Sequence, residues 1–212
     1  MKHIYCISGF GADERIFKHL YFGDHKVHFI PWKIPEKKEP LDHYVERIAA
    51  EIHHPKPKLM GVSFGGMIGV ELAKIFDLEK IILISSVKTF HELPLYMRLA
   101  GKSGINKILP LKPWSFLEPI ENYNLGVKTE EEKLLAREYR QNINPQFSNW
   151  GINEIINWKN EQYPENLIHI HGDTDRIFPI KNIKPDHVIA GGGHLMLMDK
   201  ADEVNLILQK IL

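Results

Sequence analysis

The sequence has a serine, an aspartate and a histidine that each follow a short apolar run. Together these three residue types can catalyse acyl transfer. Ser63 is the centre of Gly61-Val62-Ser63-Phe64-Gly65, which lies between an apolar run and an apolar helical pattern. A serine on such a strand-to-helix turn is held in a strained conformation that exposes its Oγ. The pattern predicts that Ser63 is a nucleophile, and a glycine-rich turn with a helix-capping serine is the alternative.

A nucleophilic serine needs a base and an acid that orients the base, and candidates for both follow later apolar runs. Asp175 lies in the stretch 171–179, and His194 follows a run of three glycines. The chain order is therefore Ser63, Asp175, His194. Because the expected strands are parallel, their carboxyl ends meet at one edge of the sheet, and the three side chains are predicted to converge there. Asp173 is the competing acid.

These motifs resemble those of the α/β-hydrolase superfamily. Gly172, Asp175 and Pro179 match the superfamily's Gly-x-x-Asp-x-x-x-Pro acid loop, and Gly193-His194 is similar to its histidine loop. The order Ser, Asp, His is also the order of this superfamily. The resemblance covers nearly the whole chain outside residues 87–166.

The resemblance also implies an oxyanion hole made of two backbone N–H groups. One belongs to the residue after the nucleophile, Phe64, and the other to Phe10 in the glycine-containing loop 8–11. This loop opens with Ser8-Gly9 where the superfamily commonly has His-Gly, which changes a supporting side chain and leaves the donor in place. A plain strand-to-helix loop is the alternative for these residues.

Short apolar runs alternate with helical patterns in the parts of the chain that carry the three residues. Strands are expected at 3–8, 27–30, 58–62, 81–85, 167–171 and 187–190. Helices are expected from Asp13 to about Leu20 and from Phe64 to Phe76, and an amphipathic helix has apolar residues at 41, 44, 45, 48, 49 and 52. This alternation predicts a parallel sheet covered by helices on both faces. The resemblance implies an α/β-hydrolase fold of about six mostly parallel strands in the order 2-1-3-4-5-6, without the superfamily's first two strands.

Residues 87–166 differ from the rest because they show helical patterns and no convincing strand. Thr129 and Glu132 form a capping-box signature that opens a helix through about Gln141. We therefore expect residues 1–86 and 167–212 to form the α/β-hydrolase core and 87–166 a helical lid insertion, with a plain second helical layer as the alternative. Its larger apolar side chains, which we expect to pack within the lid or to line an acyl pocket, are Leu93, Leu95, Met97, Leu99, Trp114, Phe116, Trp150 and Trp158.

Composition restricts the partners. The 27 basic and 27 acidic residues give a formal net charge of zero, so no global field attracts nucleic acid or a membrane surface. No apolar stretch is long enough to cross a bilayer, and the first residues do not form a signal-peptide core, so a cytoplasmic protein is expected. The single cysteine, Cys6, is expected in the core. The sequence leaves the oligomeric state open.

No cofactor and no metal are expected. His169 and His171 alternate on a predicted strand and could mimic a metal-binding pair, but no third ligand stands out near them. His53 and His54 follow a predicted helix and are expected to be solvated.

Together these features predict a serine hydrolase that cleaves an ester or thioester of a small, apolar acyl group. Two alternatives stay open: a hydrolase of carbon–carbon bonds with the same triad, and a ligand receptor or stress regulator with little turnover. A haloalkane dehalogenase is excluded, because it would need an aspartate at the position of Ser63.

Overall fold

The computed structural model describes residues 2–104 and 118–212, and these form a sheet with helices on both sides. The strands are β1 (Lys2–Ile7), β2 (His25–Ile30), β3 (Lys58–Val62), β4 (Lys80–Ile84), β5 (Leu167–Gly172) and β6 (His187–Ile189). The helices are α1 (Leu41–Ala49), α2 (Phe64–Leu72), α3 (Leu95–Ser103), α4 (Glu118–Leu125), α5 (Glu130–Asn142), α6 (Pro145–Asn157), α7 (Met196–Asp199) and α8 (Ala201–Ile211).

The described strands form one six-stranded sheet in the order β2-β1-β3-β4-β5-β6, and each neighbouring pair is parallel. The predicted order is thus confirmed. The chain adds β2 on one side of β1 and β3 on the other, so the loops after β1 and β3 diverge. This topological switch point is where open α/β sheets bind ligands.

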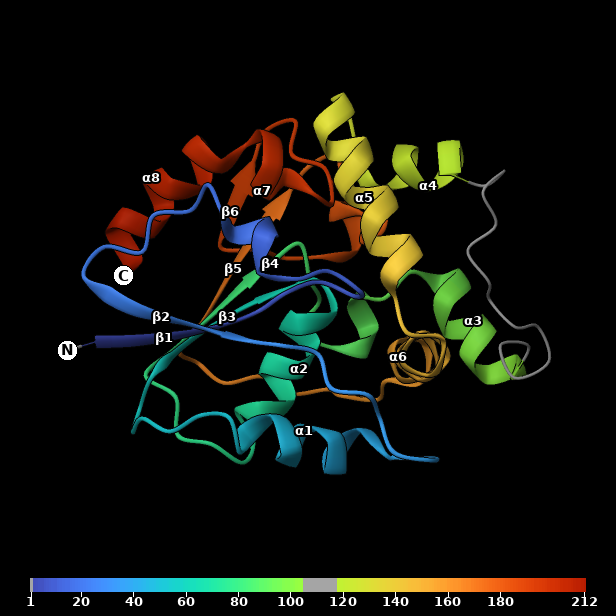
Figure 1. The fold of residues 1–212 in the computed structure, drawn as a ribbon, viewed down its shortest axis with the longest axis horizontal. Coiled ribbons are helices and arrows are strands. Elements are labelled where there is room, and N and C mark those ends of the chain that lie inside the picture. Colours follow the sequence, from blue (N-terminus) through green and yellow to red (C-terminus); the bar gives the residue numbers. More distant parts are fainter. Residues whose placement is uncertain (1, 105–117) are drawn as a thin grey trace.

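Alternate side chains of the strands enter two separate cores. Tyr5 and Ile7 pack with α1 and α2, whereas Ile4 and Cys6 pack on the other face with α8. Figure 1 shows α1 and α2 below the sheet and α7 and α8 above it. Strands that are buried on both faces are apolar along their whole length, which is why their positions could be read from the sequence.

The described residues between β4 and β5 hold a short 3-10 turn and α3 to α6, and no strand. Figure 1 shows these helices grouped at the end of the sheet opposite the N-terminus, which is the end where the parallel strands finish. The capping box is present: the Thr129 hydroxyl accepts from the Glu132 N–H, and the Glu132 carboxylate accepts from the Thr129 N–H. No described helix has the length and apolarity that a membrane span requires.

Two elements are shorter than predicted. The helix expected from Asp13 to about Leu20 is a single 3-10 turn, Glu14–Phe17, because Ile16 and Phe17 turn directly into the core. The helix expected to run from Phe64 to Phe76 ends at Leu72, and hydrogen-bonded turns continue it to Phe76.

Candidate active site

Ser63 lies at the sharp turn between β3 and α2. Its φ is 53° and its ψ −120°, a conformation that costs a residue with a Cβ of the order of 1–3 kcal/mol. Two hydrogen bonds hold the turn: Ser63 N–H donates to the Ile84 carbonyl at 3.0 Å, and Ser86 Oγ donates to the Ser63 carbonyl at 2.7 Å. The neighbouring strand β4 and the residues after it therefore stabilise the strained residue.

The strain is possible because glycines flank Ser63 where backbones meet. A Cβ on Gly61 would lie 2.5 Å from the Gly65 carbonyl oxygen, and a Cβ on Gly65 would overlap the carbonyl oxygens of Ile7 and Ser8. Close approach of β3 to α2, and of α2 to the end of β1, thus requires glycine at both positions.

The Ser63 hydroxyl does not cap α2, although Ser63 occupies the N-cap position. Its Oγ instead lies 2.8 Å from His194 Nε2, and His194 Nδ1 lies 2.8 Å from Asp175 Oδ2. All three side chains are nearly buried, with 9%, 6% and 3% of Ser63, His194 and Asp175 exposed. The structure thus brings together the serine, histidine and aspartate that the sequence singles out.

Asp175 is held by its own loop. Its Oδ1 accepts hydrogen bonds from the backbone N–H groups of Ile177 at 2.8 Å and Phe178 at 2.9 Å, which leaves Oδ2 for His194. Burial raises the pKa of the Asp175 carboxyl, but the charge and hydrogen bond of His194 and weaker contributions from His171 and the Phe178 N–H outweigh it, so the pKa lies below its usual value.

The ionised state of Asp175 decides the tautomer of the histidine. A carboxylate can only accept, so His194 Nδ1 carries the proton and donates it to Oδ2. Nε2 then has a free lone pair, which accepts the hydroxyl hydrogen of Ser63. The arrangement can therefore remove a proton from Ser63 Oγ.

The competing acid, Asp173, bonds to a backbone group of the histidine loop instead of the histidine side chain. Its Oδ1 accepts the Gly191 N–H at 2.7 Å and ties the acid loop to the histidine loop. The same two loops meet at Gly172, where a Cβ would overlap the backbone of Gly192. Asp173 therefore lies close to the site, but among the described residues it makes no hydrogen bond to His194.

The loop after β1 reaches the same end of the sheet. A Cβ placed on Gly9 would lie 3.6 Å from the Cβ of Ser63, so this backbone passes beside the nucleophile. The Gly9 carbonyl accepts from the Ala12 N–H at 3.0 Å and from Trp32 Nε1 at 2.9 Å. Neither the Phe10 nor the Phe64 N–H donates a hydrogen bond to another group among the described residues.

Three supporting residues were missed from the sequence. Trp32 and Ser86 each lie two residues past the end of a strand, β2 and β4, and this position on the same sheet edge is a signal that could have identified them. The sequence places His171 at the start of the acid-loop stretch 171–179 and gives it no role in supporting the acid. Its ring is buried on β5, donates from Nε2 to the Phe178 carbonyl at 2.7 Å, and lies 3.6 Å from Asp175 Oδ2.

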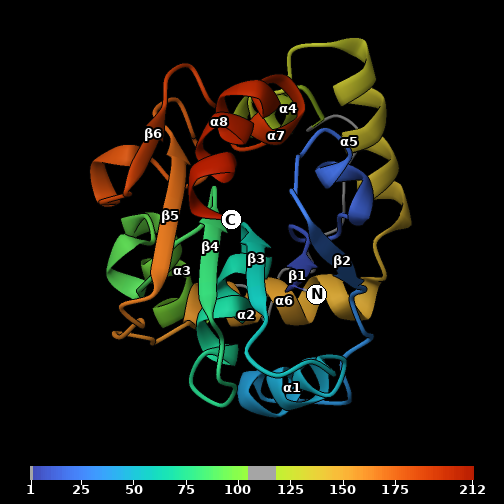
Figure 2. The same ribbon diagram turned by 90° about the vertical axis from the view of Figure 1, so that its left-hand side faces the viewer.

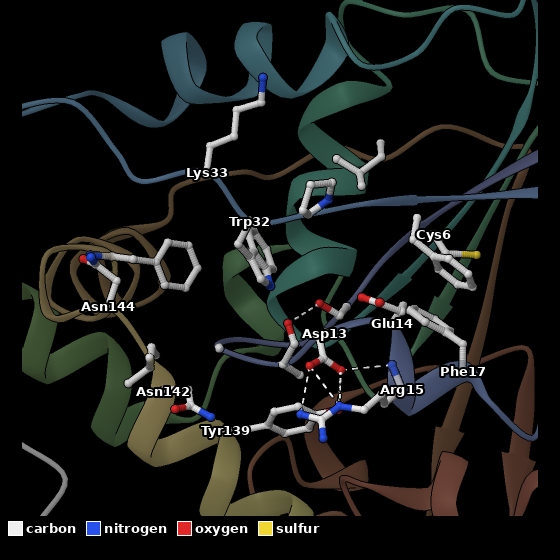
Figure 3. Close-up of a pocket in the computed structure, with 18 of the residues that line it drawn as sticks. Cys6, Asp13, Glu14, Arg15, Phe17, Trp32, Lys33, Tyr139, Asn142 and Asn144 are labelled. Carbon is white, nitrogen blue, oxygen red and sulfur yellow. Dashed lines mark hydrogen bonds and ion pairs between the residues drawn. The ribbon is translucent and has the colours of Figure 1, made fainter.

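A cavity of about 560 Å³ adjoins the loop after β1. Figure 3 shows that Asp13, Arg15, Trp32 and Tyr139 border it. Ser63, Asp175 and His194 are not among its lining residues, so the cavity does not open on the hydroxyl of the nucleophile.

Of the apolar side chains expected in the lid or an acyl pocket, Trp114 and Phe116 lie outside the described residues. Trp158 belongs to the main core, and its Nε1 donates to Glu71 Oε1 at 2.7 Å. Trp150 packs edge-on against Phe64 with ring centroids 5.9 Å apart. Leu95 and Leu99 are mostly exposed. Trp150 thus packs against the residue that follows Ser63.

Comparison with known proteins identifies the fold. The bromoperoxidase of Bacillus anthracis superposes with a TM-score of 0.70 and 18% identity, over 99% of this chain and 91% of that chain. A thermophilic esterase from Thermogutta terrifontis gives 0.71 and 15%, over 99% and 89%. The epoxide hydrolase of Bacillus megaterium gives 0.70 and 17%, over 100% and 93%. The chain has the α/β-hydrolase fold.

Sequence comparison adds little to this. No family model matches the chain. It is 28% identical over 110 residues to the lipid-A-disaccharide synthase of Glaesserella parasuis serovar 5, a match that spans 50% of this chain and 27% of that protein. Such a partial match does not establish a family. The fold itself hosts many reactions, so the activity must be argued from the site.

Proposed function

We propose that the protein is a serine hydrolase that cleaves carboxylic esters or thioesters of small apolar acyl groups, with Ser63 as nucleophile, His194 as base and Asp175 as the residue that orients the base. The observation that carries the proposal is the pair of 2.8 Å contacts made by the two nitrogens of His194. Ser63 is also strained and does not cap its helix, which supports a role beyond a structural turn.

The reaction proceeds in two steps. His194 Nε2 takes the Ser63 proton while Oγ attacks the substrate carbonyl, and the same nitrogen then protonates the departing alcohol or thiol. A water molecule that gives its proton to His194 attacks the acyl-serine and releases the acid. Asp175 stabilises the imidazolium that forms in both steps.

The negative charge on the tetrahedral intermediate needs two donors, and we assign them to the backbone N–H groups of Phe64 and Phe10. Phe64 begins α2, where unpaired N–H groups and the helix dipole favour an anion. The Gly9 carbonyl and the Phe10 N–H belong to the same trans peptide group, in which the N–H points in the direction opposite to the carbonyl. Because the Gly9 carbonyl is fixed by Trp32 and Ala12, the orientation of the Phe10 N–H is fixed as well.

We further propose that the segment 87–166, whose described residues include α3 to α6, acts as a lid over this site. Three contacts support this role. The Leu195 N–H, next to His194, donates to the Leu125 carbonyl at the end of α4 at 3.0 Å. Arg176, next to Asp175, donates to the Tyr123 carbonyl of the same helix at 2.8 Å. A Cβ on Gly151 of α6 would overlap the ring of Phe10.

The apolar surroundings support an apolar acyl group. Aromatic rings cluster around Phe64. Their centroids lie at most 6.2 Å from that of Phe64 or of another ring in the cluster, and the rings belong to Phe10, Trp32, Phe147 and Trp150. Aromatic side chains around a few polar groups are typical of sites for small molecules.

The test is a series of p-nitrophenyl esters and matching acyl thioesters of increasing acyl length, assayed with the wild type and Ser63→Ala. We expect hydrolysis that is fastest with short acyl chains and that falls at least about 10⁴-fold in the variant. Labelling of Ser63 by a fluorophosphonate probe provides an independent readout.

Other outcomes would favour another function or overturn the proposal. Labelling without ester or thioester turnover would favour the receptor or the carbon–carbon hydrolase, which a β-diketone substrate distinguishes. Neither labelling nor turnover, or full activity in Ser63→Ala, would overturn the proposal.

A further inference from the structure

Three histidines from separate parts of the chain meet at the end of the sheet where β1 begins. His3 lies near the start of β1, His28 on β2, and His54 in the loop that follows α1. One nitrogen from each of the three rings lies within 4.8 Å of the others. Figure 2 shows the N-terminus, β1 and β2 together above α1. Ser63 follows the last residue of β3 and therefore lies at the opposite, carboxyl end of the parallel strands.

The rings pack closely. His3 Nδ1 lies 2.9 Å from His28 Nε2, and the rings of His3 and His54 stack with centroids 3.5 Å apart. Each of the three side chains is half-buried, so the cluster is ordered by its neighbours and still reached from solvent. His53 is exposed, as expected, whereas His54 is only partly so.

A hydroxyl beside the cluster supports it. Tyr5 is buried, and its Oη lies 2.7 Å from His54 Nδ1 and accepts the His53 N–H at 3.1 Å. This contact occupies Nδ1 and leaves Nε2 as the nitrogen of His54 that is available to a ligand. Metal-binding histidines typically hold their second nitrogen in such a contact.

We propose that His3, His28 and His54 form a binding site for a divalent transition-metal ion, with Zn²⁺ as the representative ion. Three imidazoles without a carboxylate suit Zn²⁺, Cu²⁺ or Ni²⁺, whereas Mg²⁺ and Ca²⁺ require oxygen ligands. Water or a small anion completes the coordination.

Binding an ion requires the three side chains to rearrange. Two nitrogens on one tetrahedral zinc ion are about 3.3 Å apart, given Zn–N distances of about 2.0–2.1 Å. The contact between His3 and His28, at 2.9 Å, must therefore widen slightly as the ion replaces the shared proton. Because the rings of His3 and His54 are stacked, with 14° between their planes, at least one must also rotate about its Cβ–Cγ bond.

The surroundings of His3 and His28 favour the neutral imidazole, which is the form that binds a metal ion. Partial burial and the neighbouring histidines lower the pKa of His3 and of His28, and Lys26 acts in the same direction on both. A bound ion would join β1, β2 and the loop after α1, and it would thereby stabilise the edge of the sheet rather than take part in the reaction at the other end.

The test uses tag-free protein freed of metal with a chelator, and ZnCl₂ as the ligand. Titration calorimetry of the wild type should give one Zn²⁺ per chain, and the melting temperature should rise with Zn²⁺. His28→Asn and His54→Asn should each weaken binding by more than about 100-fold, and Tyr5→Phe by about 10-fold or more. His53→Asn is the matched control and should bind as the wild type does.

Equal binding by the wild type, His28→Asn and His54→Asn would overturn the site, as would no binding by the wild type at millimolar Zn²⁺. Loss of binding in His3→Asn alone would place the ion on the N-terminal amine and His3, and would also overturn it. Should a variant fail to fold, electron paramagnetic resonance of the Cu²⁺-loaded wild type decides: coupling to three imidazole nitrogens supports the site, and fewer contradict it.

Discussion

The two parts of the molecule that meet at Ser63 are held together in different ways. On the sheet side, buried backbone groups fix the reacting residues: Ser63 through the Ile84 carbonyl, and Asp175 through the N–H groups of Ile177 and Phe178. On the helical side, α5 is joined to the loop after β1 by exposed charged pairs, such as Arg15 with Glu138.

Buried hydrogen bonds to a charged group contribute about 1.5–3 kcal/mol each, whereas exposed ion pairs contribute about 0–1 kcal/mol. Under the proposed function, the sheet side sets the chemistry and the helical side adjusts access to it. Changes on the sheet side should lower kcat strongly, and changes on the helical side should move KM by small factors.

The largest effect after loss of the nucleophile is expected from Asp175→Asn. The amide oxygen would keep the two backbone N–H groups, so the amide NH2 would face Nδ1 as a donor. His194 then loses its favoured tautomer and the negative charge beside the imidazolium, and kcat for the best ester should fall about 10³–10⁴-fold. Asp173→Asn is the matched control, because Asp173 contacts the Gly191 N–H and not His194, and it should change kcat by less than about fivefold. Steady-state kinetics measure both, and equal losses would contradict the assignment.

A smaller loss is expected from Trp32→Phe. The variant keeps a ring to pack on Phe64 but removes the Nε1–H that fixes the Gly9 carbonyl, so the Phe10 N–H is less well oriented and kcat should fall about tenfold with KM little changed. Trp150→Phe removes an equivalent donor, whose acceptor is the Glu39 carbonyl, and should leave kcat nearly unchanged. A larger kcat loss in Trp150→Phe than in Trp32→Phe would place the effect in packing instead.

The smallest effect is expected from Arg176→Met. This change removes the hydrogen bond to the Tyr123 carbonyl and the stacking on the Tyr123 ring, where the guanidinium carbon lies 3.9 Å from the ring centroid. Loss of about 0.5–1 kcal/mol at an exposed contact should raise KM about two- to fivefold and leave kcat nearly constant. Lys181→Met, on the same connection between β5 and β6, should change neither. A fall in kcat alone would show that α4 supports the base rather than access.

The sheet could be predicted from the sequence because its central strands are short apolar runs between turn residues, and because parallel strands bring their following loops to one edge. That is enough to place Ser63, Asp175 and His194 together. In the sequence, only the spacing of the acid-loop motif favours Asp175 over Asp173. The structure supplies the physical reason: the turn 175–178 bonds the Asp175 carboxylate to its own backbone.

Other features depend on contacts between residues far apart in the chain. Nothing in the local sequence of His54 indicates His3 and His28, because each lies on a different element. The donor on Trp32 is likewise meaningful only beside Gly9, which follows another strand. The early end of the first predicted helix reflects the burial of Phe17, and local propensity does not reveal it.

The crowded backbone around Ser63 also limits which positions can be mutated to change the substrate range. Gly61 and Gly65 have no space for even one methyl group, and the atoms in the way belong to the main chain, which cannot swing aside as a side chain does. Libraries of variants at these two positions should consist largely of inactive proteins. Diversity is better introduced on α3 and α6, where Leu99 is mostly exposed and Trp150 only partly buried, and where the reacting groups are left untouched.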